Sequence, residues 1–469
     1  MFDDSAGRIA ADLRRWIDGA PPGARLPSSR ALVTRFGASP VTVQRAVREL
    51  VGLGLVESRP GVGTFVRTAP VTHVTDHSWQ TAALRAPYRQ LPAPPSPLRG
   101  GGPDTVALGS GYPAPDLLPE RLLRTAFARA GRTSAVLRPP QPEGLPALRA
   151  WFARQIEEST PTRVVPPSSR DVLIVPGSQS ALSSIFRSLI GPGGYLVLES
   201  PTYWGAIVAA AQAGVRTVPV AATPAGPDPD ELSRLFATTG ARVFYAQPTF
   251  ANPTGYSWSA ERRTAVLEIA RTHGAFVVED DWAHDFGITA GSRPLVADDG
   301  DGHVVYLRSL TKSVSPAVRV AALIARGPAR DRIAADQAAG SMYVSDVLQE
   351  VALDVVTQPG QAGRLRALRR RLRTRRDHLL GQVREHVDGA RVDSVPDGGL
   401  HLWVQLPDDI DLDRLAADCE VRGVLLAPGD GWFPAEAPGR FLRLCFAAAD
   451  PGRFADATQV IAEAVRSQR

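Results

Sequence analysis

The chain has 469 residues, of which 44% are hydrophobic and 22% charged. Because a domain usually holds roughly 100–200 residues, this length predicts more than one domain, and the composition excludes a disordered or fibrous protein. The sequence contains no run of about 18 apolar residues, and its first residues lack the basic and apolar regions of a signal peptide. We therefore expect a cytoplasmic protein without a membrane-spanning segment.

The basic residues are unevenly divided between the two types. Of 53 lysines and arginines, Lys312 is the single lysine. Arginine cannot replace lysine in forming a Schiff base with an aldehyde, because that reaction needs an amine that can lose its proton. Lys312 is therefore a candidate for covalent chemistry, with an ordinary surface lysine as the alternative. The net charge of +5 permits binding to a polyanion but does not demonstrate it.

The two cysteines, Cys419 and Cys445, both stand in apolar surroundings near the C-terminus. Two cysteines give neither a disulfide framework nor a cluster of metal ligands. We expect both to be reduced core residues and predict no metal site.

Three regions follow one another along the chain. Residues 70–104 are rich in proline and contain a run of three glycines, which is typical of an extended linker. Residues 1–69 show short helical patterns, whereas residues 105–469 alternate strand-like runs with helical stretches. This alternation predicts an α/β domain with a mainly parallel, doubly wound sheet. From about residue 329 the pattern becomes helical and arginine-rich and then ends in strands and helices, which predicts a smaller C-terminal subdomain.

The predicted strands are short apolar runs. They are Val172–Val175, Tyr195–Leu198, Val215–Val220, Val243–Ala246, Phe276–Val278, Val304–Leu307 and Leu400–Leu406.

The N-terminal region predicts three helices, one over Ala6–Gly19, one capped by Ser28 or Ser29, and one capped by Ser39. Two serine caps on either side of a turn that contains Gly37 describe a helix-turn-helix. The following segment, LVESRPGVGTFV, predicts a β-hairpin around a proline-glycine turn. The sequence from PGARLPSSR to GVGTFV resembles the GntR-type winged helix-turn-helix over nearly its whole length.

This resemblance implies double-stranded operator DNA as a partner. A recognition helix that begins at Ser39 presents its exposed side chains to the major groove, and its N-terminal amides face phosphates. Each single position also has an alternative reading as a solvated cap, helix face or turn. The positions that the resemblance implies are Arg30, Ser39, Thr42, Gln44, Arg45, Arg59 and Gly61.

The single lysine stands in a hydroxyl-rich segment, SLTKSVSPAVR, that follows a strand-like run. In this setting Lys312 can capture the aldehyde of a coenzyme. Ser309, Thr311 and Arg319 can hold the coenzyme's phosphate through charge-assisted hydrogen bonds.

Other motifs in the same region suit the same coenzyme. Ser178 and Gln179 lie in a glycine turn before a helix, where free amides form an anion site. Asp280, in the sequence FVVEDDW, can keep a pyridinium nitrogen protonated. Asn252 in ANPTG can donate a hydrogen bond to a phenolic oxygen, and Tyr203 in SPTYW can stack on the ring.

Taken together, GSQS, SPTYW, ANPTG, EDD, SLTKS and FLRLCF resemble, in order and spacing, the fold-type I aminotransferases of class I/II over roughly residues 105–465. The resemblance implies pyridoxal 5′-phosphate as cofactor, bound to Lys312 as an internal aldimine. It further implies Asp280 at the ring nitrogen, Asn252 at the phenolic oxygen and Arg443 at a substrate carboxylate. The implied phosphate ligands are Ser178, Gln179, Ser309 and Arg319.

The chain departs from this family at the position after the EDD acids. The common tyrosine is Trp282 here, which we still expect to contact the cofactor; it keeps an N–H donor but loses the phenol next to the coenzyme oxygen. A tyrosine that often precedes the PEGLPALR segment is also absent. Both changes are expected to weaken catalysis more than binding.

With its N-terminal module, the whole chain resembles the regulators of the MocR/GabR type. The leading hypothesis is a transcription regulator that senses a small amino compound through the Lys312 aldimine, and a variant of it has pyridoxal phosphate itself as the effector. The alternative is an active aminotransferase that transfers an amino group between an amino acid and a 2-oxo acid. Because fold-type I sites are built between two subunits, the resemblance also implies a homodimer.

Overall fold

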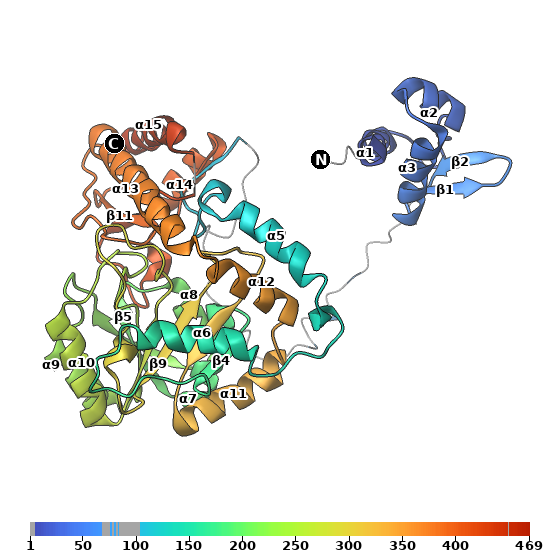
Figure 1. Ribbon diagram of the computed structural model, residues 1–469. Helices are drawn as coiled ribbons and strands as arrows, with labels where there is room; N and C mark the ends of the chain where they lie inside the picture. Colours follow the sequence, from blue (N-terminus) through green and yellow to red (C-terminus); the bar gives the residue numbers. More distant parts are fainter. Residues whose placement is uncertain (1–4, 68–75, 77–78, 81–82, 84–103, 449) are drawn as a thin grey trace. The chain divides into compact units, whose positions relative to one another are not determined.

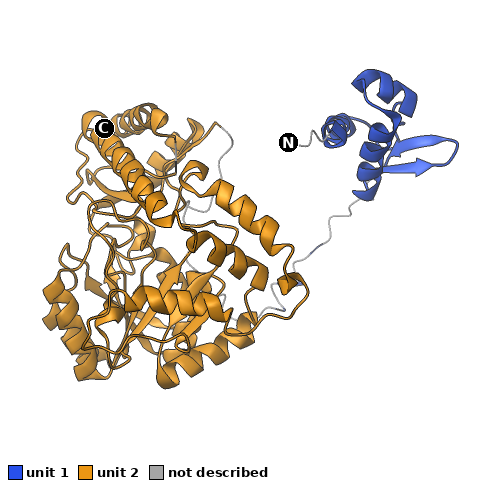
Figure 2. Ribbon diagram, viewed as in Figure 1, with its two compact units in different colours: residues 1–89 blue, residues 90–469 orange. Residues whose placement is uncertain are grey.

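The structure, a computed structural model, describes residues 5–67, 76, 79–80, 83, 104–448 and 450–469. It contains two compact units, residues 1–89 and residues 90–469 (Figure 2). Apart from positions 76, 79–80, 83 and 104, the predicted linker lies outside the described residues. Within the described part of the chain, none of the helices is long and apolar enough to cross a membrane. The same residues contain no group of three His, Cys, Asp or Glu that could hold a metal ion.

Over residues 5–67 the first unit is a three-helix bundle followed by a two-stranded hairpin (Figure 1). The predicted caps are confirmed, because the hydroxyl oxygens of Ser28 and Ser39 accept hydrogen bonds from backbone amides in the first turns of their helices. Gly37 ends the second helix in the left-handed conformation. The bounds are α1 (Ser5–Asp18), α2 (Ser29–Phe36), α3 (Pro40–Gly52), β1 (Val56–Arg59) and β2 (Gly63–Val66).

A small apolar core holds this unit together. Leu13 of α1, Leu32 of α2 and Val43 of α3 are almost completely buried against one another. Val56 and Val66, which are paired across the hairpin, close the same core. The helix-turn-helix and its wing therefore form one packed body.

The second unit is built on a seven-stranded sheet with the order β4-β10-β9-β8-β7-β5-β6. All neighbouring strands are parallel except β10, which runs antiparallel to both β4 and β9. The predicted α/β class is therefore confirmed, and each predicted strand of this sheet coincides with an observed one to within a few residues. The bounds are β4 (Val172–Val175), β5 (Tyr195–Ser200), β6 (Arg216–Ala221), β7 (Val243–Ala246), β8 (Phe276–Asp280), β9 (Val304–Ser309) and β10 (Ala321–Ile324).

Helices cover both faces of the sheet. Alternate residues of each strand point to opposite faces, so Ile174 belongs to the apolar core under α6, α9, α10 and α12, whereas Leu173 belongs to the core under α7, α8 and α11. Burial on both faces explains the continuous apolar strands of the sequence. The helix bounds are α5 (Glu120–Ala130), α6 (Pro146–Glu157), α7 (Ser178–Leu189), α8 (Trp204–Ala213), α9 (Pro229–Thr239), α10 (Ala260–His273), α11 (Gly327–Ser341) and α12 (Asp346–Val356).

The C-terminal part forms a second layer around two small sheets, β11-β13 and β12-β3. Its apolar core is continuous from Leu368 of α13 to Val465 of α15, and Val106 of β3 joins it from the beginning of the unit. Cys419 and Cys445 are buried free thiols, as expected. The bounds are β3 (Val106–Ala107), α13 (Gln361–His386), β11 (His401–Leu406), α14 (Leu412–Val421), β12 (Val424–Leu425), β13 (Arg440–Cys445) and α15 (Phe454–Arg466).

Candidate functional site

A cavity of about 240 Å³ lies where β8 and β9 end and α7 begins. Ligand sites in α/β folds occupy this edge, because loops that leave the carboxyl ends of parallel strands converge there. All ten residues predicted to bind the cofactor line the cavity. Tyr112, Trp204 and Gln247 also line it and were missed, although Gln247 stands directly after β7, where the strand-end rule would have found it.

Lys312 follows β9, and its half-buried side chain lines this cavity. Burial, and then the nearby positive charge of Arg443, lower the pKa of Lys312 to about 8, while the negative charge of Asp280 opposes this shift. Its Nζ atom lies 4.2 Å from the centre of the Trp282 ring. The single lysine of the chain is thus in a position where a useful fraction of its amine is unprotonated near neutral pH.

Three consecutive acids end β8, but only Asp280 faces the cavity. Asp280 Oδ2 accepts hydrogen bonds from the Tyr245 hydroxyl and the Gln247 amide, each at 2.9 Å. Its other oxygen, Oδ1, is buried and has no hydrogen-bond partner among the described residues. An unpaired buried carboxylate oxygen is costly, so it fits a donor such as a protonated pyridine nitrogen.

The two neighbouring acids are occupied by other parts of the protein. Glu279 accepts hydrogen bonds from two backbone amides of the segment after Pro294. Asp281 accepts from the Tyr306 hydroxyl and pairs with His284 at 2.6 Å. Asp280, which faces the cavity, differs from these two acids: burial raises its pKa, and the hydrogen bonds that it accepts from Gln247 and Tyr245 oppose this rise.

The opposite end of the cavity suits an anion. Gly177 has a φ of 89°, and a Cβ atom there would approach the Arg319 guanidinium to 2.8 Å, so the glycine lets this cation lie against the start of α7. The hydroxyls of Ser178 and Thr311 are buried and unpaired among the described residues. Free hydroxyls, first-turn amides and a guanidinium together fit the phosphate of the coenzyme.

Gln179 and Ser309 are already partly engaged. The Gln179 amide donates to the Gly205 carbonyl at 2.8 Å, and its oxygen accepts from the Tyr203 hydroxyl at 3.2 Å. Gln179 therefore fixes Tyr203, and its backbone amide in the first turn of α7 remains for an anion. Ser309 Oγ accepts a hydrogen bond from the Thr311 amide at 3.1 Å, which leaves its hydroxyl proton available.

Arg443 joins the site from β13, in the other layer. Its guanidinium is buried, donates to the oxygen of Asn252 at 3.1 Å and to the Gly109 carbonyl at 2.8 Å, and lies 4.9 Å from the Trp432 ring centre. Burial lowers the pKa of Arg443 to about 10. By accepting from Arg443, the Asn252 oxygen leaves the amide N–H groups of this side chain free to donate into the cavity.

Trp282 differs from what the sequence suggested. Its indole N–H donates to the Phe250 carbonyl at 3.0 Å and is therefore not directed at a coenzyme. What Trp282 offers the cavity is the face of its ring, on which the Lys312 amine lies. The tryptophan thus supplies an aromatic wall in place of a phenol donor.

The predicted DNA-contacting residues gather in the first unit. Arg30, Gln44, Arg45 and Gly61 are exposed. The others are exposed or half-buried, and three of them carry internal contacts: Ser39 caps α3 and shares a 2.8 Å hydrogen bond with the Thr42 hydroxyl, while Arg59 pairs with Glu57. Arg25 also lies against the wing: its backbone forms a β-bridge with Phe65, and a Cβ atom on Gly63 would come within 2.7 Å of its guanidinium.

Comparisons with known proteins agree with this arrangement. Residues 103–461 match the family Aminotransferase class I and II, and residues 5–66 match the gntR family of bacterial regulatory proteins. The vitamin B6 salvage pathway transcriptional repressor PtsJ of Salmonella typhimurium is 27% identical over 95% of this chain and 93% of its own length. The probable rhizopine catabolism regulatory protein MocR of Rhizobium meliloti is 26% identical over 91% of this chain and 86% of its own length.

Enzymes and a solved structure are similar to the second unit. The 2-aminoadipate transaminase of Thermus thermophilus is 28% identical over 78% of this chain and 91% of its own length. The crystal structure of LysN, an α-aminoadipate aminotransferase of the same species, superposes with a TM-score of 0.71 and 28% identity over 78% of this chain and 93% of LysN. The protein therefore belongs to the aminotransferase class I and II family and is a GntR-type regulator, in which a helix-turn-helix domain is fused to an aminotransferase-like domain.

Proposed function

We propose that this regulator holds pyridoxal 5′-phosphate on Lys312 and changes its affinity for operator DNA when a small amino compound binds there. The observation that carries the proposal is the environment of the single lysine, whose amine has a lowered pKa in a cavity that also contains the unpaired oxygen of Asp280. The same chain carries a helix-turn-helix domain, so binding in this cavity can be coupled to DNA binding.

When bound, the coenzyme would supply an aldehyde that condenses with amines and a ring that withdraws electrons. The residues of the chain would hold it in place: Asp280 would accept the ring N–H, and the Asn252 amide would donate to the phenolic oxygen. The phosphate would be held by the Ser178 and Thr311 hydroxyls together with Arg319. The unprotonated Lys312 amine would provide the nucleophile and later take up or release a proton at Nζ.

Arg443 would select amino compounds that carry a carboxylate. It is a buried guanidinium whose Nε has no hydrogen-bond partner among the described residues, and it contacts Asn252 at the edge of the cavity. A carboxylate placed beside it would gain a charge-assisted hydrogen bond in surroundings of low dielectric constant. We therefore propose an amino acid or a related amino carboxylate as the effector.

We further propose that the protein works in the cytoplasm as a homodimer that binds two operator half-sites. A dimer is the usual partner of paired half-sites, because its symmetry matches that of the DNA. Regulation requires only that the effector binds two arrangements of the protein with different affinities. The difference in binding free energy is typically about 1–3 kcal/mol.

A second candidate function is aminotransferase activity. It is favoured by the lowered pKa of Lys312, which lets this side chain take up and release protons near neutral pH, and by the similarity to transaminases. Turnover separates the two functions. Steady conversion of an amino acid and a 2-oxo acid supports the enzyme, whereas one slow spectral change without turnover supports the sensor.

The proposal is tested by adding pyridoxal 5′-phosphate to the purified chain, recording the visible spectrum, reducing with borohydride and locating the adduct by mass spectrometry. We expect a yellow protein with a pyridoxyl group on Lys312, and no such group in the variant Lys312→Ala. A colourless protein, or an adduct only at the N-terminal amine, would contradict the proposal.

A further inference from the structure

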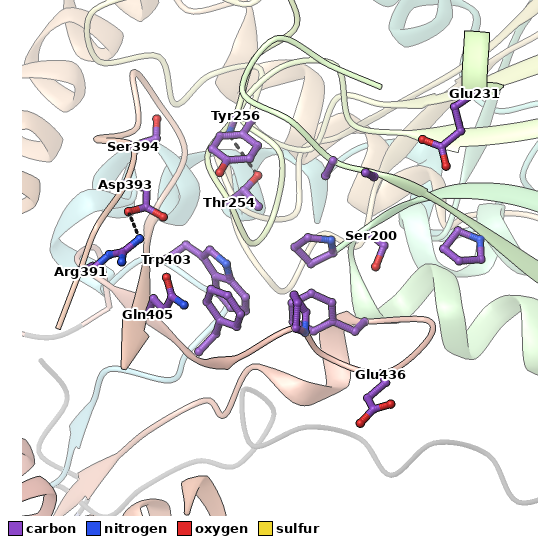
Figure 3. Close-up of a pocket in the computed structure, with 17 residues that line it drawn as sticks. Ser200, Glu231, Thr254, Tyr256, Arg391, Asp393, Ser394, Trp403, Gln405 and Glu436 are labelled. Carbon is purple, nitrogen blue, oxygen red and sulfur yellow. Dashed lines mark hydrogen bonds and ion pairs between the residues drawn. The ribbon is translucent and has the colours of Figure 1, made fainter. Parts of the chain in front are cut away.

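A second cavity, of about 530 Å³, lies between the seven-stranded sheet and the C-terminal layer (Figure 3). Its walls come from the ends of β5 and β6, from the turn after Asn252, and from β11 and β13 with the loops beside them. None of its lining residues lines the cavity that contains Lys312. The two cavities therefore have separate sets of lining residues.

Aromatic rings form one wall of this second cavity. Trp403 lies flat on Phe441, with ring centres 5.0 Å apart and an angle of 4° between the planes. Phe433 stands 5.6 Å from Phe441 and 6.2 Å from Trp403. Because Trp403 and Phe441 are only half-buried, their remaining surface is open to a ligand that carries a flat or apolar group.

The charged groups around these rings are mainly acidic. Figure 3 shows Glu231 and Glu436 on the same side of Trp403, and Asp393 on the other side next to Arg391. Arg391 pairs with Asp393 at 3.4 Å and is the one cation among the lining residues. The Glu231 carboxylate lies 4.0 Å from the guanidinium of Arg234, a residue that does not line the cavity. Glu436 forms no salt bridge with any described residue. The side with Glu231 and Glu436 thus carries excess negative charge.

Two segments of the chain contribute to the walls of both cavities. After β5, Pro201 lines the second cavity and Tyr203 lines the first. In the turn at residues 252–254, Thr254 lines the second cavity and Asn252 lines the first. Trp403 is paired across the strands with Arg443, and the Trp432 ring lies near both, 6.2 Å from the Trp403 ring and 4.9 Å from the Arg443 guanidinium. A ligand on Trp403 would therefore lie close to the residue that we propose to bind the effector's carboxylate.

We propose that this second cavity binds an organic cation with a flat apolar body, held without a covalent bond. The ring of the ligand would stack on Trp403, and its positive charge would face Glu231 and Glu436. An aromatic surface attracts a cation through its quadrupole, and carboxylates add attraction at longer range. A pocket that combines apolar rings with a few placed charges is a common form of small-molecule site.

Benzyltrimethylammonium is a suitable probe, because it has a flat ring and a permanent charge but cannot condense with the coenzyme's aldehyde. Its affinity for the coenzyme-loaded full chain is measured by calorimetry, alongside benzyl alcohol and phenylacetate. We expect the cation to bind at least about tenfold more tightly than either analogue. Equal affinities for the three compounds would overturn the proposal, since charge would then play no part.

Substitutions locate the probe. The double variant Glu231→Gln/Glu436→Gln should weaken binding about fivefold or more, and Trp403→Leu should weaken it further. Glu261→Gln, which removes an exposed carboxylate from α10 outside the cavity, is the matched control and should leave binding unchanged. Because the glutamines replace side chains at the protein surface, folding is preserved even if Trp403→Leu is unstable.

Two further results would overturn the assignment. One is an equal change in the affinity for the probe in the double glutamine variant and in the Glu261→Gln control. The other is binding to the coenzyme-free chain that is absent from the coenzyme-loaded chain, because the probe would then occupy the cavity of Lys312. If Lys312 proves not to hold the coenzyme, the probe should still bind, so the two proposals fail independently.

Discussion

At Lys312, burial and the positive charge of Arg443 act in the same direction and favour the neutral amine. Sequence reasoning found this lysine because it is the only one in the chain, and it found Asp280 because the acid ends a strand. It could not find the hydrogen bond between Arg443 and Asn252, which lie 191 residues apart, because no local pattern encodes that contact. Nor could it find that the Trp282 N–H is used by Phe250, since this depends on how a distant loop turns.

The lowered pKa of Lys312 predicts a pH dependence. With a pKa of about 8 rather than 10.5, about one-tenth of the amine is unprotonated at pH 7, which is roughly three hundred times the usual fraction. The rate of condensation with pyridoxal 5′-phosphate should therefore rise with pH, with a midpoint near pH 8, and level off above about pH 9. Stopped-flow absorbance measures this rate. Arg443→Gln should move the midpoint to higher pH, and a midpoint near 10 in the unsubstituted protein would contradict the account.

The hydrogen bond of Trp282 predicts a cost in stability. In Trp282→Phe the buried Phe250 carbonyl loses its donor, so the free energy of unfolding should fall by about 1–3 kcal/mol. Denaturant unfolding of the coenzyme-free protein measures this change. Trp204→Phe is the control, because Trp204 lines the same cavity without such a hydrogen bond. Equal losses in the two variants would show that ring size, and not the hydrogen bond, sets the cost.

At the scale of elements, apolar periodicity predicted the parallel strands well because both their faces are buried. It missed β10, whose sequence AALI is short and alanine-rich and carries no strand signal of its own. This strand is fixed by its neighbours, since it fits between β4 and β9 with hydrogen bonds on both sides. The helix caps of the first unit, in contrast, are local features, and the sequence specified them directly.

The cap of α2 gives a prediction for the DNA-binding unit. Ser28 Oγ accepts a hydrogen bond from the Ala31 amide at 3.2 Å, so Ser28→Ala should cost about 1 kcal/mol of local stability. Hydrogen exchange of the α2 amides should become about fivefold faster. Ser29→Ala, one residue later and without a cap bond, should change exchange little. Similar acceleration in both variants would count against the cap.

At the scale of the whole molecule, the two compact units carry different chemistry. Arg45→Ala, in the recognition helix, should weaken operator binding by about 1–3 kcal/mol and leave the coenzyme spectrum unchanged. Lys312→Ala should abolish the spectrum and leave the first unit folded. Filter binding and absorbance spectroscopy measure the two effects. Loss of the coenzyme from Arg45→Ala would show that the two functions are not divided in this way.

Operator affinity tests most directly whether an amino compound acts through Lys312 to change DNA binding. The operator is first selected from genomic fragments, and its dissociation constant is then measured for the coenzyme-loaded chain over a panel of amino acids. We predict that at least one of them shifts the constant by about 5–150-fold, and that Lys312→Ala loses this shift. An affinity that no amino compound alters, or a shift that persists in Lys312→Ala, would contradict the account.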